Sequence, residues 1–393
     1  MNIVFLTSSL GAGGAERVST ILCNAWSARG DRVTLIPTYS GGGTPFYPLS
    51  EQVETLFLAD QPGVRSRSPG GYARRLLTLR RMILGRRPDV VVSFLPNVNV
   101  AAILAMAGSR VPLIVSERND PSSRSPFNPW EVASRALFRF ADMLTVQTEA
   151  VAAKAAARYP GVARVRVVPN PLAPQQAEQQ PVQAAGGEGQ RRILLSLGRL
   201  AGQKGVDTII RAFAELAPHH PEWDLHIYGE GPLAGALAAL AASLGMQERI
   251  AFKGVTTGPA RVMAGADAFV MASLHEGFPN ALLEAMSLGL PCLSTDCPSG
   301  PGEITRNGRD ALLVPVNDQA AFTSGLRRLM GNEALRRALG REARVSIQER
   351  FALDAVLARW DDLFAEVMSG RADGRLRPAG LHPVRAQFRG NGK

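Results

Sequence analysis

Two kinds of segment alternate along almost the whole chain. Short apolar runs, typical of strands buried on both faces of a parallel sheet, are followed by segments with apolar residues at helical spacing. In the first half the predicted strands cover residues 2–6, 33–36, 53–58, 89–94, 113–116, 143–146 and 164–168. The predicted helices of this half cover residues 15–26, 72–87, 97–108, 129–140 and 148–159.

The alternation stops in residues 173–190, which are rich in Gln, Ala, Gly and Pro, and then restarts. Predicted strands follow at residues 193–197, 225–228, 250–252, 268–271 and 291–294. Predicted helices follow at residues 206–217, 233–244, 258–264, 278–286, 318–330, 333–348 and 352–368. The pattern predicts an α/β protein with two doubly wound, Rossmann-like domains, at 1–172 and 191–350. We expect a linker at 173–190, a separate helix at 351–369 and a basic disordered tail at 370–393.

Composition agrees with a globular protein, since 46% of the 393 residues are hydrophobic and 20% are charged. No run reaches the roughly 18–20 apolar residues that a membrane span needs. The first residues lack the basic segment of a signal peptide and predict a strand. Three cysteines form neither a metal-binding spacing nor a disulfide framework, which fits a cytoplasmic protein.

The formal net charge of +10 indicates an anionic partner or an Arg-rich composition without functional meaning. Residues 370–393 contain six basic residues and one acidic residue. In residues 72–87, Leu76, Leu79, Met82 and Ile83 form one helical stripe. Arginines flank it at Arg74, Arg75, Arg80, Arg81, Arg86 and Arg87. This helix suits a membrane surface or a polyanion, or it packs on the core with a solvated arginine face. Neither basic segment contains interleaved aromatic residues, which argues against nucleic acid.

A glycine loop follows the first strand and includes Gly13 and Gly14. Glu16 stands where a dinucleotide fingerprint requires a third glycine, and the lysine of a P-loop is missing. The loop is therefore predicted to support a phosphate or a substrate, without being a dinucleotide or ATP loop. Glu117, Arg118 and Asn119 follow another strand of this half, at the edge where α/β sheets bind ligands.

In the second half, polar residues and glycines follow the strand ends, at Gly198, Arg199, Lys204, Gly229, Gly231 and Glu276. A helix starting near Phe278, Pro279, Asn280 and Ala281 offers free N–H groups to a phosphate. Arg199 and Lys204 add two cations, so a diphosphate can be neutralised without a metal. Glu284 is then placed to accept ribose hydroxyls and Glu276 to bind a sugar, which predicts a nucleotide-sugar ligand. The alternative is an ordinary helix with one solvated glutamate and one loop glutamate.

These motifs together resemble the retaining glycosyltransferases of family GT4, which have the GT-B fold. The resemblance covers roughly residues 1–368 and includes residues 13–16, 198–200, 204–205, 229–232 and 276–284. It implies catalytic roles for Glu276, Arg199 and Lys204. It implies a donor site at Gly14, Gly198, Gly229, Gly231, Phe278, Pro279, Asn280, Ala281 and Glu284. It also implies that the last helix crosses back to the first domain.

Residues 13–18, 116–121 and 295–301 are similar to a subgroup that extends polyprenyl-diphosphate-linked oligosaccharides. This resemblance implies a UDP-sugar donor, a lipid-linked acceptor and work at the inner face of the cell membrane. It implies an acceptor site at Gly13, Glu16, Arg74, Arg75, Arg80, Arg81, Glu117, Arg118 and Asn119. We expect no metal or other cofactor, because no Asp-x-Asp pair stands where it would hold a divalent ion.

One departure from the family is the missing first-domain histidine, since no histidine occurs before Pro218. Front-face attack with retention needs no protein nucleophile, so the reaction remains feasible. Alternative interpretations are transfer to a soluble or lipopolysaccharide-core acceptor, and epimerisation of a sugar nucleotide. A non-enzymatic alternative is a basic protein that binds membranes or nucleic acid.

Overall fold

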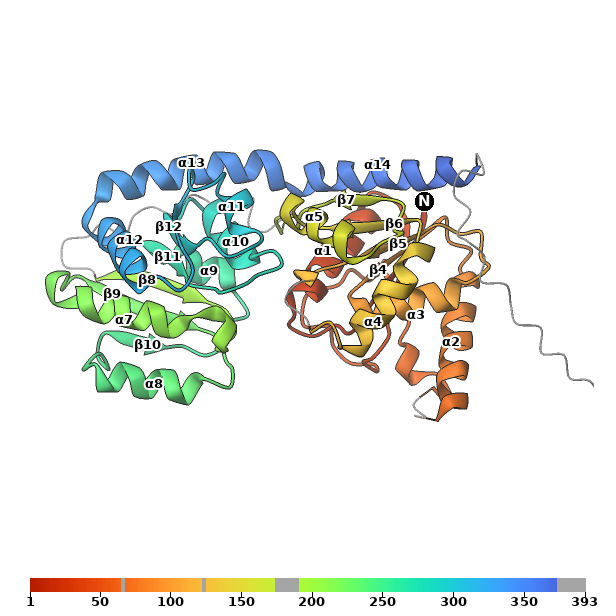
Figure 1. The fold of residues 1–393 in the computed structure, drawn as a ribbon, viewed down its shortest axis with the longest axis horizontal. Helices are drawn as coiled ribbons and strands as arrows, with labels where there is room; N and C mark the ends of the chain where they lie inside the picture. The colour runs from red at the N-terminus through yellow and green to blue at the C-terminus, as the bar shows by residue number, and fades with distance from the viewer. Residues whose placement is uncertain (65–67, 122–124, 174–190, 373–393) are drawn as a thin grey trace, which may run out of the picture.

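The computed structural model describes residues 1–64, 68–121, 125–173 and 191–372. The predicted linker and basic tail lie almost entirely outside these residues. Within the described ranges, the chain forms two parallel sheets, each covered by helices (Figure 1). This arrangement confirms the predicted α/β class with two doubly wound units. The boundaries proposed for the domains stay a prediction.

The first sheet has seven described strands in the order β3-β2-β1-β4-β5-β6-β7, all paired in parallel. Its strands are β1 (Asn2–Thr7), β2 (Arg32–Pro37), β3 (Glu54–Thr55), β4 (Val90–Phe94), β5 (Leu113–Ser116), β6 (Met143–Val146) and β7 (Val165–Val167). Its helices are α1 (Gly14–Ala28), η1 (Leu58–Asp60), α2 (Pro69–Leu84), α3 (Pro96–Met106), α4 (Pro129–Leu137), η3 (Phe138–Phe140) and α5 (Glu149–Arg158).

The first sheet is buried on both faces because successive strand residues point to opposite sides. Ile3 and Phe5 of β1 belong to one apolar cluster, whereas Val4 and Leu6 belong to the cluster on the other face. All four side chains are fully buried. This explains why the strands read as continuous apolar runs rather than as alternating ones.

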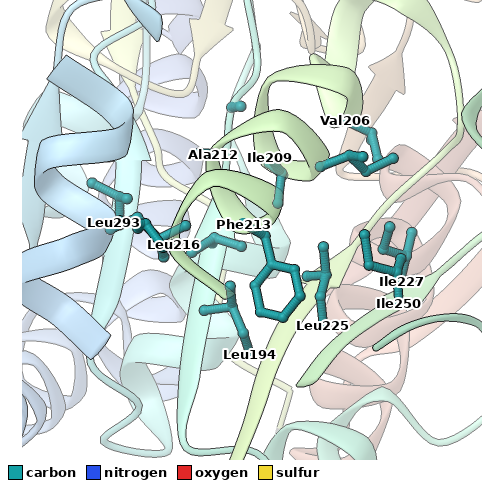
Figure 2. Close-up of a cluster of buried hydrophobic side chains, with 14 of the residues drawn as sticks. Leu194, Val206, Ile209, Ala212, Phe213, Leu216, Leu225, Ile227, Ile250 and Leu293 are labelled. Carbon is teal, nitrogen blue, oxygen red and sulfur yellow. The ribbon is translucent and has the colours of Figure 1, made fainter. Parts of the chain in front are cut away.

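The second sheet has six described strands in the order β10-β9-β8-β11-β12-β13, also parallel. Its strands are β8 (Arg192–Leu197), β9 (Trp223–Tyr228), β10 (Ile250–Phe252), β11 (Ala268–Met271), β12 (Cys292–Thr295) and β13 (Leu312–Val314). Its helices are η4 (Gly202–Lys204), α7 (Val206–Leu216), η5 (Ala217–His219), α8 (Ala234–Ser243), α9 (Pro259–Ala264), α10 (Asn280–Ser287), α11 (Pro301–Ile304), α12 (Gln319–Gly331) and α13 (Glu333–Phe351). Figure 2 shows one face of its core, where Phe213 of α7 packs beside Leu194 and Leu225 of the sheet.

Two strand predictions differ from the structure. The run at 53–58 forms only the two-residue strand β3, because the chain then turns into η1 and buries Leu58. Strand β13 was not predicted; its three apolar residues are only half-buried and form the edge of the sheet, where they pair with β12.

The last helix, α14 (Leu353–Ala372), returns to the first domain as the resemblance implied. It continues the direction of α13, so that the two helices lie end to end along one side of the molecule (Figure 1). Trp360 and Phe364 of α14 contact Trp26 of α1, with ring centroids 5.8 and 5.5 Å from that ring. The first core is therefore completed by residues from the far end of the chain.

Candidate functional site

A cavity of about 360 Å³ lies between the two sheets and is lined by residues of both halves of the chain. The first half contributes the loop after β1, the loop after β5 and the turn after β7. The second half contributes the ends of β8, β9 and β11 and the start of α10. These segments meet because ligand sites of parallel sheets form beyond the carboxyl ends of the strands.

Many of the residues predicted from the sequence line this cavity. They are Gly14, Arg118, Asn119, Gly198, Lys204, Glu276, Phe278, Pro279, Asn280, Ala281 and Glu284. Helix α10 begins at Asn280, and Pro279 caps it instead of occupying its first turn as predicted. The free backbone N–H groups of the helix start therefore belong to residues at the cavity wall.

Glu276 lies on the loop between β11 and α10 and is almost fully buried. The Lys204 Nζ atom donates to Glu276 Oε1 over 2.5 Å, and Ser273 Oγ donates to the same oxygen over 2.6 Å. Ser299 Oγ donates to the Glu276 backbone carbonyl, which fixes the loop from the other side. A carboxylate and an ammonium group are thus held together at one end of the cavity.

Glu284 lies in the second turn of α10 and faces the first domain. Its carboxylate accepts a hydrogen bond from Arg17 Nη1 of α1, and the two side chains are only 6% and 17% exposed. Arg17 also lies 5.9 Å from the centre of the Tyr47 ring. Arg17 and Tyr47 line the cavity but were not predicted from the sequence, because their partners become visible only after the two halves meet.

A second set of polar contacts crosses the cavity near the turn that follows β7. Asn170 Oδ1 accepts hydrogen bonds from Arg118 and, over 3.1 Å, from Gln147 Nε2. Asn170 Nδ2 donates to Asn280 Oδ1 over 2.6 Å, which links the turn to the start of α10. Burial lowers the pKa of the Arg118 guanidinium to about 9, so it stays charged at neutral pH.

Three of the predicted glycines do not line the cavity. They leave space for close contacts between neighbouring segments instead. A Cβ on Gly229 would lie 1.9 Å from the Gly198 carbonyl oxygen, and one on Gly231 would lie 2.3 Å from that of Leu200. These glycines allow the loops after β8 and β9 to touch. Gly13 makes room for the Glu16 carboxylate, which accepts hydrogen bonds from Ser8 and Ser9 over 3.0 and 2.9 Å.

The remaining predicted residues do not line this cavity either. Arg199 is exposed and does not line it, and Glu117 is buried beneath it, with Tyr159 Oη 3.3 Å from Glu117 Oε2. The arginines of α2, at Arg74, Arg75, Arg80 and Arg81, do not reach it either. Arg80 donates instead to the carbonyls that end α3, at Ala105 and Ala107, over 2.7 and 2.9 Å.

Comparison with known sequence families matches each half of the chain. Residues 13–171 match the family described as "Glycosyl transferase 4-like domain", and residues 179–346 match "Glycosyl transferases group 1". The chain is a glycosyltransferase of family GT4. Its two sheets and returning helix are the GT-B fold that the sequence motifs implied.

Relatives of this glycosyltransferase differ in how much of each protein is matched. It is 26% identical over 371 residues to a Campylobacter jejuni α-1,4-N-acetyl-D-galactosaminyltransferase, named for a diphospho-undecaprenol-linked saccharide, covering 93% of this chain and 99% of the relative. It is 40% identical over 178 residues to an exopolysaccharide phosphotransferase of Streptomyces coelicolor, but those residues span 45% of this chain and only 19% of that protein. The solved structure of sucrose-phosphate synthase from Thermosynechococcus elongatus has the same fold, with a TM-score of 0.78 at 17% identity, over 94% of this chain and 99% of that one.

Cys297 of the glycosyltransferase is buried and lies close enough to Glu276 to be affected by its charge. Burial, and then the negative charge of Glu276, raise the pKa of this thiol to about 12. The thiol is thus protonated at neutral pH, and a protonated thiol is a poor nucleophile.

Two further observations concern metals and membranes. Within the described part of the glycosyltransferase, no three His, Cys, Asp or Glu side chains cluster in a way that could hold a metal ion. Among the same residues, no helix is both long and apolar enough to cross a membrane. Metal-independent transfer stays a prediction.

Proposed function

We propose that this glycosyltransferase moves a hexose or N-acetylhexosamine from a UDP-sugar to a polyprenyl-diphosphate-linked saccharide, with retention of anomeric configuration. It would work at the cytoplasmic face of the membrane. The observation that carries the proposal is the single cavity in which Lys204, Glu276, Glu284 and the start of α10 meet.

The cavity offers separate partners for each part of a nucleotide sugar. The diphosphate lies at the start of α10, where the helix dipole and free N–H groups favour an anion. Lys204, with the exposed Arg199 beside the cavity, neutralises the diphosphate. Glu284 accepts the ribose hydroxyls after it releases Arg17, and Glu276 binds hydroxyls of the transferred sugar.

The reaction then needs no protein nucleophile. The acceptor hydroxyl oxygen bonds to the anomeric carbon on the face that the diphosphate leaves, while the bond from that carbon to the phosphate oxygen breaks. The hydroxyl proton passes to the departing diphosphate. Fixed cations and the helix start stabilise the charge that develops on the leaving group.

The lipid-linked acceptor is supported by two observations. The Campylobacter relative, which this chain matches over nearly its full length, is named for a saccharide carried on diphospho-undecaprenol. The first domain also carries the basic helix α2, whose Arg74 and Arg81 are exposed. Exposed cations favour an acceptor with a diphosphate group over a neutral soluble sugar.

The test combines a donor panel with a synthetic undecaprenyl-diphosphate-linked hexosamine as acceptor. UDP-linked hexoses and N-acetylhexosamines and GDP-mannose are each supplied, and the product linkage is read by NMR. We expect transfer from one UDP-sugar with an α-linked product, and activity that survives EDTA. Glu276→Gln should lower kcat/KM by roughly a hundredfold or more, whereas the exposed control Glu248→Gln should not change it.

Several outcomes would contradict the proposal. Transfer to a free oligosaccharide but not to the lipid-linked one would overturn the acceptor assignment. Interconversion of UDP-sugars without an acceptor would indicate an epimerase. Activity lost in EDTA and restored by Mg²⁺ would refute metal independence, and full activity in Glu276→Gln would remove Glu276 from the reaction.

A further inference from the structure

A second cavity, of about 620 Å³, lies within the first domain and is separate from the site between the domains. It is enclosed by the loop after β2, by η1 and by helices α2, α3 and α4. Its lining is predominantly apolar and includes Leu58, Val64, Leu76, Leu79, Val100 and Leu104. Its volume falls in the range of cavities that bind small organic ligands. We call it the apolar groove.

The apolar groove opens to solvent between large hydrophobic side chains. Four of its lining residues are exposed by more than a third, namely Tyr39 at 43%, Tyr72 at 57%, Leu104 at 39% and Trp130 at 44%. They come from four different elements or loops, so no single helix accounts for them. Exposed apolar surface gathered around a hollow is characteristic of a binding site, because isolated exposed residues need no explanation but clusters do.

Among the described residues that line the apolar groove, Arg75 carries a positive charge. The Arg75 guanidinium stacks 4.5 Å from the centre of the Tyr39 ring and donates to the Thr38 carbonyl, so it is held in a fixed position. On the same helix, the exposed Arg74 and Arg81 line a neighbouring hollow. The groove thus combines a long apolar wall with positive charge beside it, which matches an amphipathic anion.

The apolar groove also adjoins the site between the domains. Tyr39 N–H donates to the Ser8 carbonyl over 2.8 Å, and Ser8 belongs to the loop after β1. The same loop leads into Gly14 and Arg17, which line the cavity between the domains. Both hollows therefore open at the carboxyl edge of the first sheet.

We propose that the apolar groove binds the first isoprene units of the polyprenyl-diphosphate acceptor, with the diphosphate beside Arg75 and Arg74. This inference rests on the proposed function and deepens it, because it assigns a protein site to the lipid rather than to the sugar. It means that the enzyme recognises the hydrocarbon chain itself, and not only the membrane in which the chain is dissolved.

The test titrates the full-length enzyme with farnesyl diphosphate and, separately, with inorganic diphosphate. We expect farnesyl diphosphate to bind at least tenfold more tightly and to change the fluorescence of Trp130. Leu104→Gln and the groove-filling Ala101→Trp should reduce this preference at least fivefold. Leu77→Gln is the matched control, since Leu77 is exposed on α2 but does not line the groove.

Other results would overturn the inference. Equal affinity for the two probes, or a preference that survives Leu104→Gln, would mean that the chain is not bound there. If Leu104→Gln lowers binding to phosphatidylglycerol vesicles but leaves the farnesyl preference intact, the groove is a membrane-facing surface. UDP binding is measured for every variant and should not change. Because the titrations need no sugar transfer, failure of the groove and failure of the proposed function are distinguishable.

Discussion

At the scale of single residues, the ion pair formed by Arg17 and Glu284 lies at the end of the cavity where we propose that the nucleotide binds. One residue belongs to α1 and the other to α10, so the contact joins the two domains. A ribose that bonds to Glu284 has to replace the guanidinium. The carboxylate is therefore not vacant in the structure, because Arg17 Nη1 donates to Glu284 Oε1.

We predict that Arg17→Ala tightens the binding of UDP by roughly ten- to a hundredfold. A hydrogen bond to a charged group contributes roughly 1.5–3 kcal/mol, and the variant no longer has to break one when UDP binds. Isothermal titration measures the change, and Arg211→Ala, at an exposed position of α7, is the control. Weaker binding in Arg17→Ala would mean that Arg17 contacts the donor phosphates directly.

The sequence predicted those site residues whose position follows from a local rule. Lys204, Glu276 and Asn280 follow strand ends or start a helix, Glu284 lies one turn into that helix, and all four line one cavity. Arg17 gave no such signal, because its role depends on a helix from the other domain. The arginines of α2 look equivalent in the sequence. Only the structure shows that Arg80 donates to a carbonyl near the end of α3, whereas Arg74 is exposed.

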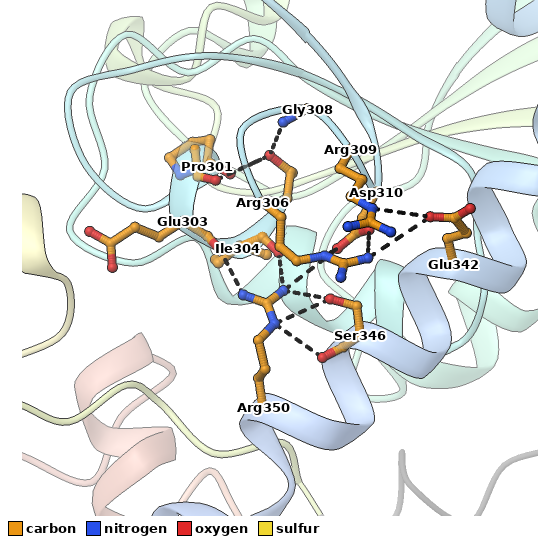
Figure 3. A network of polar contacts seen from close by, with 12 residues as sticks. Pro301, Glu303, Ile304, Arg306, Gly308, Arg309, Asp310, Glu342, Ser346 and Arg350 are labelled. Atoms are coloured by element: carbon orange, nitrogen blue, oxygen red, sulfur yellow. Dashed lines mark hydrogen bonds and ion pairs between the residues drawn. The ribbon is translucent and has the colours of Figure 1, made fainter.

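At the scale of elements, a network of charges fastens α11 and the loop after it to α13 (Figure 3). Arg350 of α13 donates to the Glu303 carbonyl over 2.8 Å, and Arg306 Nε donates to Asp310 Oδ2 over 2.7 Å. The loop needs this support because Arg306 and Asn307 both have left-handed backbone angles, with φ of 51° and 55°. Held this way, the Glu303 carboxylate accepts the Ala150 N–H at the start of α5 over 3.0 Å.

We predict that Asp310→Asn lowers the free energy of unfolding by about 1–3 kcal/mol at pH 7. Burial alone would raise the pKa of Asp310, but the hydrogen bonds from Arg306 and Ser346 and the nearby arginine charges outweigh it and lower the pKa. A lowered pKa stabilises the fold above the unfolded value of about 3.9 and loses that effect as the pH falls below it.

Urea unfolding at pH 7, 5 and 4 measures this effect in the wild type and in Asp310→Asn. The difference between them should be constant from pH 7 to about pH 5 and shrink toward pH 4 and below. Asp362→Asn, exposed on α14, is the control. A difference that grows on acidification would contradict the assignment.

The elements themselves were largely predictable, and the exceptions have a common cause. Long helices such as α7 and α13 carry enough turns for a 3.6-residue pattern, and each begins within one residue of the predicted start. Short edge elements such as β3 and β13 contain too few residues for any period. Their form is decided by neighbouring strands rather than by their own sequence.

At the scale of the whole molecule, the two domains touch closely along the cavity. A Cβ on Gly277 would lie 2.5 Å from the Arg118 carbonyl oxygen and 2.8 Å from the Asn119 Cα atom. A Cβ on Gly14 would lie 3.2 Å from Asn280 Nδ2. The structure is therefore a closed arrangement, and glycine at these positions permits the closure.

We predict that Gly277→Ala lowers kcat roughly a hundredfold, because displacement of the reacting groups by about 1 Å has an effect of that size. The Kd for UDP and the melting temperature should stay close to wild type, since the substitution affects the approach of the domains rather than either core. Steady-state kinetics, titration and calorimetry measure the three quantities. Gly235→Ala is the control, because its Cβ would meet open space. An unchanged kcat would show that this closed arrangement is not the reactive one.

The return of α14 to the first domain has a consequence for the order in which the protein is synthesised. The ribosome makes β1 and α1 early, but Trp360 and Phe364, which pack against Trp26, come only after the entire second sheet. At about 5–20 residues per second, the aromatic cluster around Trp26 stays incomplete for tens of seconds. The first domain is thus synthesised first but completed last. The nascent chain must remain soluble while the α14 part of the first core has not yet been synthesised.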